Sequence, residues 1–217
     1  MASTTNTVYV VTGANRGLGL ALTKRLLERP ATTVVASVRS HDAATSLRSD
    51  IENVAVGENN EITMAFAAAV STVTHIDVVI CNAGFPTPMT PALVTSAEDL
   101  HRLLPPKLVV ISSSVGSIAG QEPFPGGAYG PSKAASNWLT KALHLQNEAD
   151  GLVAFALHPG WVQTRAGDFA AKEWGYPGSP PVTVEDSVKG MLGVIDSATR
   201  ENVSGKFVSF TGDILSW

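Results

Sequence analysis

Residues 108–138 read LVVISSSVGSIAGQEPFPGGAYGPSKAASNW and join three different kinds of segment. The apolar, β-branched run at 108–111 predicts a buried strand, which ends in three serines. A loop rich in glycine and proline follows. The alanine-rich segment after it predicts a helix, because Pro131 stands early enough to be tolerated in the first turn.

Tyr129 and Lys133 are four residues apart, so a helix places them on one face, about 6 Å apart along its axis. A free tyrosine has a pKa near ~10 and is a poor proton donor or acceptor at neutral pH. A neighbouring ammonium favours the phenolate and lowers that pKa. With a strand-end serine opposite, the segment predicts a proton-transfer site without metal or thiol. The alternative is a surface tyrosine beside a solvated lysine.

Composition limits the class of protein. The chain has 217 residues, 44% hydrophobic and 16% charged, which indicates a single folded domain over residues 1–217. Its net charge of -4 argues against nucleic-acid and anionic-membrane partners. One cysteine excludes an internal disulfide framework. The first residues lack a signal-peptide pattern, and no apolar run could span a bilayer, so we expect a cytoplasmic protein.

The N-terminal segment combines a strand, a glycine-rich turn and a helix. A β-rich run at 7–12 precedes GANRGLG at 13–19, and apolar residues at helical spacing continue to Pro30. This arrangement places backbone N–H groups and a helix N-terminus against a phosphate. Gly13 would allow the tight turn, Gly17 the approach of the ligand, and Gly19 the packing of helix on strand. A plain glycine-rich turn is the alternative.

The second predicted strand, 31–38, ends at Arg39. In a doubly wound fold this strand end lies near the adenosine ribose. An acidic residue there binds the ribose hydroxyls, whereas a basic residue accommodates the 2′-phosphate of NADP. No acidic residue ends this strand, and Arg16 adds a second cation. The pattern favours NADP(H) over NAD(H), unless Arg39 is an ordinary surface arginine.

Strands and helices alternate along the rest of the chain, which predicts a doubly wound Rossmann fold of the α/β class, with a parallel sheet covered on both faces. Every motif named above falls at the carboxyl end of a strand, where such folds bind ligands. Residues 165–181, rich in glycine, proline and aromatic residues, predict a substrate flap. The other predicted segments are a helix at 41–48, a short third strand at 53–56, a helical segment at 61–73, strands at 76–81, 152–157 and 205–210, and a helix at 182–196.

Five motifs in this order resemble the short-chain dehydrogenase/reductase family. They are Thr12 to Gly19, Asn82-Ala83-Gly84, Ser113, Tyr129 with Lys133, and Pro159-Gly160. The sequences ISSSVGSIAG, HPGWVQT and SGKFV are similar to those of the carbonyl-reductase-like branch. This branch includes fungal ketoreductases of the norsolorinic-acid type. The resemblance implies NADPH-dependent reduction of a small-molecule ketone or aldehyde, with a polyketide-type ketone as one candidate.

The resemblance also assigns roles. Tyr129 would protonate the carbonyl oxygen, Lys133 would lower the pKa of Tyr129 and bind the nicotinamide ribose, and Thr164 would hold the carboxamide. The catalytic serine would be Ser113, with Ser112 and Ser114 as alternatives, while His158 would be structural. No metal ligands are expected. The cofactor-binding set would be Gly13, Asn15, Arg16, Gly17, Leu18, Gly19, Arg39, Asn82, Ala83, Gly84, Tyr129, Lys133, Pro159, Gly160, Val162 and Thr164.

Two departures from the family pattern support a second hypothesis. The aspartate that contacts adenine is absent, with Glu58 or Asn59 as the available substitutes. Only 23 residues, 85–107, precede the central strand, where the family has a long helix that carries a catalytic asparagine and packs at the subunit interface. The alternative function is therefore a catalytically impaired NADP-binding protein with a regulatory or vestigial role. A homo-oligomer is compatible with the sequence, but the segment that would decide it is short.

Overall fold

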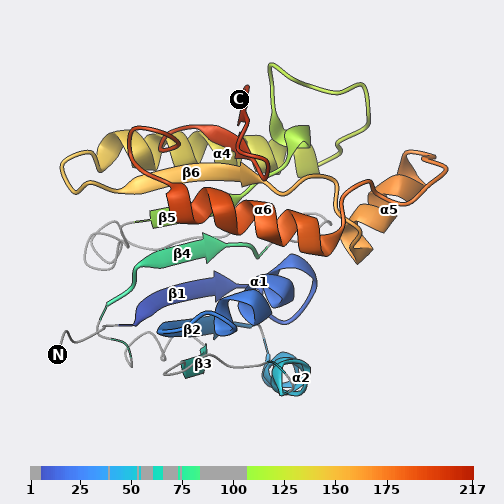
Figure 1. Ribbon diagram of the computed structural model, residues 1–217. Coiled ribbons are helices and arrows are strands. Elements are labelled where there is room, and N and C mark those ends of the chain that lie inside the picture. Colours follow the sequence, from blue (N-terminus) through green and yellow to red (C-terminus); the bar gives the residue numbers. More distant parts are fainter. Residues whose placement is uncertain are drawn as a thin grey trace.

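The protein forms an α/β fold around one sheet, in which the strands follow the order β3-β2-β1-β4-β5-β6-β7-β8 (Figure 1). The computed structural model describes residues 6–38, 40–52, 54, 61–65, 73, 75–83 and 107–217. The strands are β1 (Thr7–Thr12), β2 (Thr32–Ser37), β3 (Glu61–Ala65), β4 (Val78–Cys81), β5 (Lys107–Ile111), β6 (Val153–His158), β7 (Phe207–Ser209) and β8 (Ile214–Leu215). Neighbouring strands are parallel except β7 and β8. This confirms the predicted Rossmann architecture.

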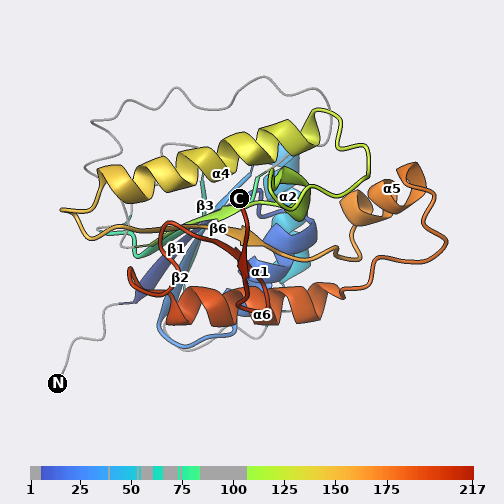
Figure 2. The ribbon, with the colours of Figure 1, turned by 90° about the horizontal axis from the view of Figure 1, so that it is seen from above.

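Helices cover both faces of the sheet. Figure 2 shows α4 on one face and α1 with α6 on the other. Within the described residues, no helix is long and apolar enough to cross a membrane. The helices are α1 (Gly17–Leu27), α2 (His41–Ile51), α4 (Tyr129–Gln146), α5 (Arg165–Glu173) and α6 (Val184–Ser197), and a short 3-10 helix, η2, spans Ser114–Gly116.

Alternating residues along the strands divide the core into two layers. On β1, Tyr9 and Val11 join the cluster that contains Leu22 of α1 and Met191 of α6. Val8 of β1 and Val35 of β2 belong to a separate cluster. Side chains of a strand point to opposite faces at every step, so an apolar run supplies both layers at once. This explains why the buried strands read as continuous apolar runs.

Most predicted elements are present, but the segment after α2 differs. The third strand of the sheet is β3, at the start of the segment 61–73 that was predicted to be helical, so that prediction is wrong there. Its five residues pair in parallel with β2 from Thr33–Glu61 to Ser37–Ala65. Pairing with the free edge of β2 therefore outweighs the helical propensity of the alanine-rich sequence. The strand expected at 53–56 lies outside the described residues except for Val54, as do Glu58 and Asn59. Of the predicted short connection at 85–107, only Lys107 is described.

Candidate active site

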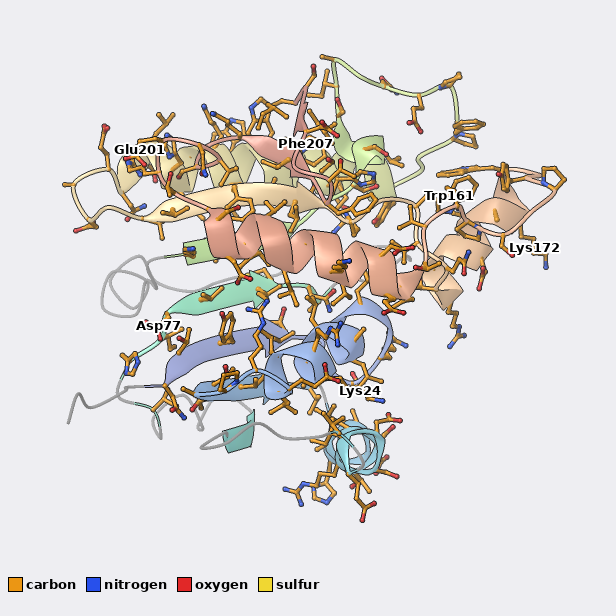
Figure 3. All side chains as sticks on the ribbon, in the orientation of Figure 1. Lys24, Asp77, Trp161, Lys172, Glu201 and Phe207 are labelled. Carbon is orange, nitrogen blue, oxygen red and sulfur yellow. The ribbon has the colours of Figure 1, made fainter. Side chains whose placement is uncertain are left out.

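The motif residues gather where the parallel strands end. Figure 3 shows Trp161 at the same end of the sheet as α5, with Asp77 at the opposite end. Ile111 of β5 pairs with Leu157 of β6, and the Ser112 amide donates to the Leu157 carbonyl at 2.8 Å. The three serines and His158 therefore leave neighbouring strands side by side.

The glycine-rich turn depends on three glycines in different ways. Gly13 and Gly17 have φ angles of 67° and 54°, a backbone region that other L-residues rarely adopt. A Cβ at Gly19 would collide with the carbonyl of Gly13 and with the side-chain amide of Asn82. The predicted roles of Gly13 in the turn and of Gly19 in packing therefore agree with the geometry.

Asn82 and Ala83 hold the glycine-rich turn in place. The Asn82 Nδ2 donates to the carbonyls of Thr12 and Gly13 at 3.0 and 3.3 Å, and the Ala83 amide donates to the Thr12 Oγ1 at 3.0 Å. The end of β4 is thus tied to the end of β1. Because Asn82 bonds to protein carbonyls, it would act on a cofactor through the shape of the turn.

The start of α1 fits the phosphates of a dinucleotide. Its N-cap residue, Arg16, makes no side-chain cap hydrogen bond, and no acidic residue stands in the first turn. A Cβ at Gly17 would meet no described atom within 4 Å, so this part of the turn is open. Backbone N–H donors and the helix dipole favour an anion there. Asn15 and Leu18 are partly buried in the same turn, whereas Arg39 and Gly84 lie outside the described residues.

Tyr129 is the first residue of α4 and is partly buried. Burial raises the pKa of its phenol above the ordinary value, while a hydrogen bond from Ser113 acts in the opposite direction. The structure therefore brings together two of the three predicted catalytic residues. A phenol with a raised pKa stays protonated at neutral pH but is a weaker acid, so it can give up its proton only to an oxygen on which negative charge develops.

Lys133 lies one turn further along α4. Its Nζ is 5.6 Å from the centroid of the Tyr129 ring and donates to the carbonyl of Ile111 at 2.8 Å. Burial lowers the pKa of the Lys133 ammonium. We expected Lys133 to lower the pKa of Tyr129. In the structure, burial has the largest effect on this pKa and raises it, and the group that lowers it is Ser113.

Of the three consecutive serines, Ser112 is buried, whereas Ser113 and Ser114 are partly exposed. Ser112 is 1% exposed, and its hydroxyl donates to the Oδ1 of Asn137 at 2.5 Å. Ser113 faces Tyr129 and accepts a 3.4 Å hydrogen bond from the Val115 amide. This geometry favours Ser113 over Ser112 as the substrate-facing hydroxyl. Sequence reasoning missed Asn137, although its spacing of four from Lys133 on the same helix could have indicated it.

The segment after β6 contains more regular structure than predicted. Gly160 has a φ of 85°, and Val162 forms a parallel bridge with Val182. Thr164 is the N-cap of α5, and its Oγ1 accepts from the Gly167 amide at 3.2 Å. The Pro159 carbonyl accepts from the Ser187 hydroxyl at 2.7 Å. The predicted flap at 165–181 therefore begins with a capped helix.

Aromatic rings connect this segment to the loop that precedes Tyr129. Trp174 stacks on Phe124 with centroids 5.2 Å apart, and its Nε1 donates to the Pro125 carbonyl at 3.2 Å. Trp161 contacts Trp174 and Tyr176 at centroid distances of 5.5 and 4.7 Å. These rings join the loop that precedes Tyr129 to the segment 161–176.

Comparisons with known proteins show the family of this chain. The family model described as short chain dehydrogenase matches residues 7–106. A norsolorinic acid ketoreductase of Aspergillus parasiticus is 37% identical, over 97% of this chain and 91% of that protein. Short-chain dehydrogenase RED3 of Pyricularia oryzae is 32% identical, over 98% of this chain and 99% of that protein.

Solved structures show the same fold. The carbonyl reductase Sniffer of D. melanogaster superposes with a TM-score of 0.74 at 25% identity, and an NADPH-bound carbonyl reductase from chicken fatty liver with 0.73 at 26%. In both cases the match covers 98% of this chain and 99% of the other.

The alignment with the Aspergillus protein spans 251 positions, although this chain has 217 residues. The relative therefore carries residues that this chain lacks, which agrees with the short connection expected before the central strand but does not place the difference. The relatives match almost the whole chain, and the solved structures share its fold. This protein is an oxidoreductase of the short-chain dehydrogenase/reductase family.

Proposed function

We propose that this protein is an NADPH-dependent reductase that converts a ketone or aldehyde into an alcohol. The observation that supports it most is the partly buried Tyr129 phenol, which lies beside Ser113 and one helical turn from Lys133. This set lies at the carboxyl edge of the sheet, the same edge as the glycine-rich turn. The carbonyl reductases and ketoreductases among its relatives support the same reaction class.

The chemistry divides between the cofactor and the protein. NADPH, when bound, supplies the hydride that reduces the carbonyl carbon. The Ser113 hydroxyl would donate a hydrogen bond to the carbonyl oxygen of the substrate and so hold it beside Tyr129. The Tyr129 phenol, which is protonated at neutral pH, would give its proton to that oxygen as negative charge develops. Lys133 would then stabilise the phenolate that remains.

The predicted catalytic set is tested by NADPH oxidation with a panel of aliphatic and aromatic ketones. Tyr129→Phe should lower kcat by roughly 10²-fold or more, since general acid catalysis contributes about that much. Tyr9→Phe is the matched control, because Tyr9 lies on β1 and bonds to Arg29, away from the strand carboxyl ends. Equal turnover by the parent and Tyr129→Phe would sink the mechanism.

The preference for NADP(H) is tested by direct binding. Titration with NADPH and with NADH, followed by tryptophan fluorescence, should show tighter binding of NADPH. Arg16→Ala and Arg39→Ala should remove the difference while leaving NADH binding unchanged. Arg16 is exposed at the start of α1, whereas the role of Arg39 rests on the sequence. The NADPH-bound carbonyl reductase among the similar structures supports this assignment.

The substrate is proposed to be a small-molecule carbonyl compound, with a polyketide-type ketone as the first class to test. The norsolorinic acid ketoreductase of Aspergillus parasiticus among its relatives supports this choice. The relatives reported above are named as reductases or dehydrogenases, so they do not support the inactive cofactor-binding alternative. The cytoplasmic location and the homo-oligomer stay predictions.

A further inference from the structure

The side chain of His158 contacts the backbone next to Ser113. Its Nδ1 accepts a hydrogen bond from the Ser114 amide at 3.2 Å. A nitrogen that accepts carries no proton, so the proton of the neutral ring lies on Nε2. Burial keeps this imidazole neutral, because it lowers the His158 pKa to about 4. His158 thus restrains the residue that follows the proposed substrate-facing hydroxyl.

The short helix η2 is held from two sides. From α4, Asn137 accepts from the Ser112 hydroxyl at 2.5 Å and donates to the Gly116 carbonyl at 3.4 Å. From β6, the His158 ring binds the Ser114 amide. Ser113 stands between these anchors, and its side chain, which caps η2, is the one that reaches Tyr129. Removing the His158 anchor would leave Ser113 restrained by Asn137 from the α4 side and by the bond of the Ser112 amide to the Leu157 carbonyl of β6.

The His158 ring is itself packed in place. Its centroid is 6.5 Å from that of Phe207 in an edge-to-face contact, and Phe207 stacks on Trp217 at 5.9 Å. The Trp217 carbonyl then accepts from the Ala119 amide at 2.9 Å, just beyond η2. These contacts link the His158 ring back to the segment that follows η2. The His158 ring therefore has little freedom to leave the Ser114 amide.

We propose that His158 is a positioning residue that keeps the Ser113 hydroxyl aimed at Tyr129 by accepting the Ser114 amide hydrogen. This proposal rests on the proposed function for its effect on turnover, but the geometry it invokes is measurable without turnover. Among the described residues, His158 makes a hydrogen bond with the Ser114 amide and a ring contact with Phe207, and neither contact involves the Tyr129 phenol. Its effect therefore passes through Ser113 and should vanish when Ser113 has no hydroxyl.

The first experiment compares His158→Leu with His158→Asn. Leucine fills similar space without an acceptor, whereas the Oδ1 of asparagine stands at the same distance along the side chain as the Nδ1 of histidine. We expect His158→Leu to lower kcat about tenfold with the KM for NADPH unchanged, and His158→Asn to recover most of it. If His158→Leu does not fold, His158→Phe supplies the same comparison. A kcat equal to that of the parent protein in the variant without an acceptor would overturn the proposal. Equal losses of kcat in that variant and in His158→Asn would also overturn it.

A double-mutant cycle separates positioning from general damage. Ser113→Ala combined with His158→Leu should be no slower than Ser113→Ala alone, because both changes remove the same interaction. If the losses of kcat in the two single variants multiply in the double variant, His158 acts independently of Ser113, which contradicts the proposal.

The last measurement needs no activity. Tyrosine labelled with ¹³C at Cζ gives three signals in this chain, and Tyr129→Phe assigns the one of interest. The Ser113 hydrogen bond lowers the pKa of Tyr129, so His158→Leu should raise that pKa as Ser113→Ala does. An unchanged Tyr129 titration in His158→Leu would refute the positioning role. A parent protein without turnover would refute only the proposed function, since the titration still reports on Ser113.

Discussion

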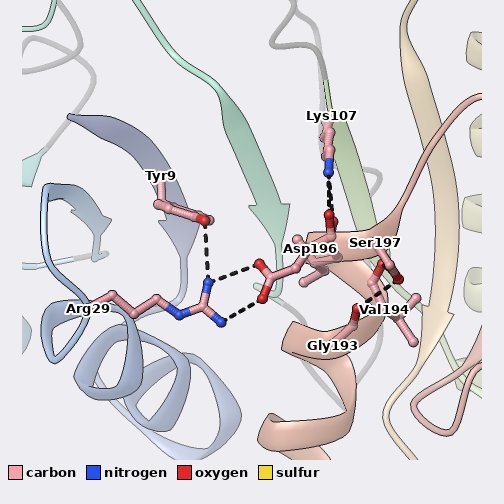
Figure 4. Close-up of polar contacts among 8 residues, drawn as sticks. Tyr9, Arg29, Lys107, Gly193, Val194, Asp196 and Ser197 are labelled. Atoms are coloured by element: carbon pink, nitrogen blue, oxygen red, sulfur yellow. Dashed lines mark hydrogen bonds and ion pairs between the residues drawn. The ribbon is translucent and has the colours of Figure 1, made fainter. Parts of the chain in front are cut away.

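Arg29 and Asp196 form a two-pronged ion pair, with the guanidinium nitrogens 2.9 and 2.8 Å from the carboxylate oxygens (Figure 4). The pair links the residue just after α1 to the last turn of α6, at the strand end opposite the site. Lys107, the first residue of β5, donates to the Ile195 and Asp196 carbonyls at 2.9 and 3.1 Å. These contacts bind the two helices of one face to each other and to the sheet.

Arg29→Ala should lower the free energy of unfolding by about 1 kcal/mol, since a bidentate pair of partly exposed groups is worth roughly that much. Urea unfolding at low and high salt measures this, and the difference should shrink at high salt. Arg25→Ala is the matched control, because its pair with Glu28 is more exposed and lies within one helix turn. A loss in the control as large as in Arg29→Ala would contradict this interpretation.

Two glycines of α6 should respond in opposite directions to alanine. A Cβ at Gly193 would meet no described atom within 4 Å, so Gly193→Ala should stabilise the protein by about 0.5–1 kcal/mol through helix propensity. A Cβ at Gly190 would collide with the carbonyl of Phe210, so Gly190→Ala should destabilise it. Thermal unfolding of both variants gives the test, and the same sign of change in both would count against the packing described.

Alanine substitutions should separate the roles of the serines. Ser113→Ala should lower kcat roughly 10²-fold with little change in melting temperature, because the hydroxyl faces Tyr129. Ser112→Ala should lower stability by about 1–3 kcal/mol, since it leaves the buried Asn137 with an unmet acceptor. Measurement of kcat and melting temperature for both variants tests this prediction. A loss of kcat in Ser112→Ala together with a loss of stability in Ser113→Ala would assign the substrate-facing hydroxyl to Ser112.

Acid should destabilise the protein partly through His158. Its pKa is about 4 in the folded protein and near 6.5 when unfolded, so the unfolded state binds more protons between these values. This contribution to stability is fully present above pH 6.5 and is lost as the pH falls toward 4, by up to about 3 kcal/mol. Urea unfolding from pH 7 to 4.5 should show a shallower acid loss in His158→Asn. If the parent and His158→Asn lose the same amount of stability between pH 7 and 4.5, His158 is excluded as a cause.

Trp174 should control access to the site from α5. Trp174→Ala removes the stack on Phe124 and the bond to the Pro125 carbonyl, whereas Trp174→Phe removes only the bond. If residues 165–181 act as a substrate flap, the KM for a bulky ketone should rise severalfold in Trp174→Ala and less in Trp174→Phe. Cleavage within 165–181 during limited proteolysis should accelerate in the same order. Unchanged KM values in both variants would argue against the flap.

The sequence alone determined the elements whose signals are local. The apolar run at Leu108 to Ile111, the glycine-rich turn and the spacing of Tyr129 and Lys133 predicted strand, turn and helix, because burial, left-handed glycines and helical periodicity act over a few residues. Parallel strands place their carboxyl ends together, so the gathering of the motifs at one edge also followed from the pattern.

Only the tertiary structure decided features that depend on distant partners. The alanine-rich segment after Glu61 begins as a strand because the edge of β2 offers backbone hydrogen bonds. The structure favours Ser113 over Ser112 because Asn137 binds the latter. Burial, rather than Lys133, sets the direction of the Tyr129 pKa. Burial and long-range hydrogen bonds arise only when segments far apart in the chain pack together, so no local pattern encodes them.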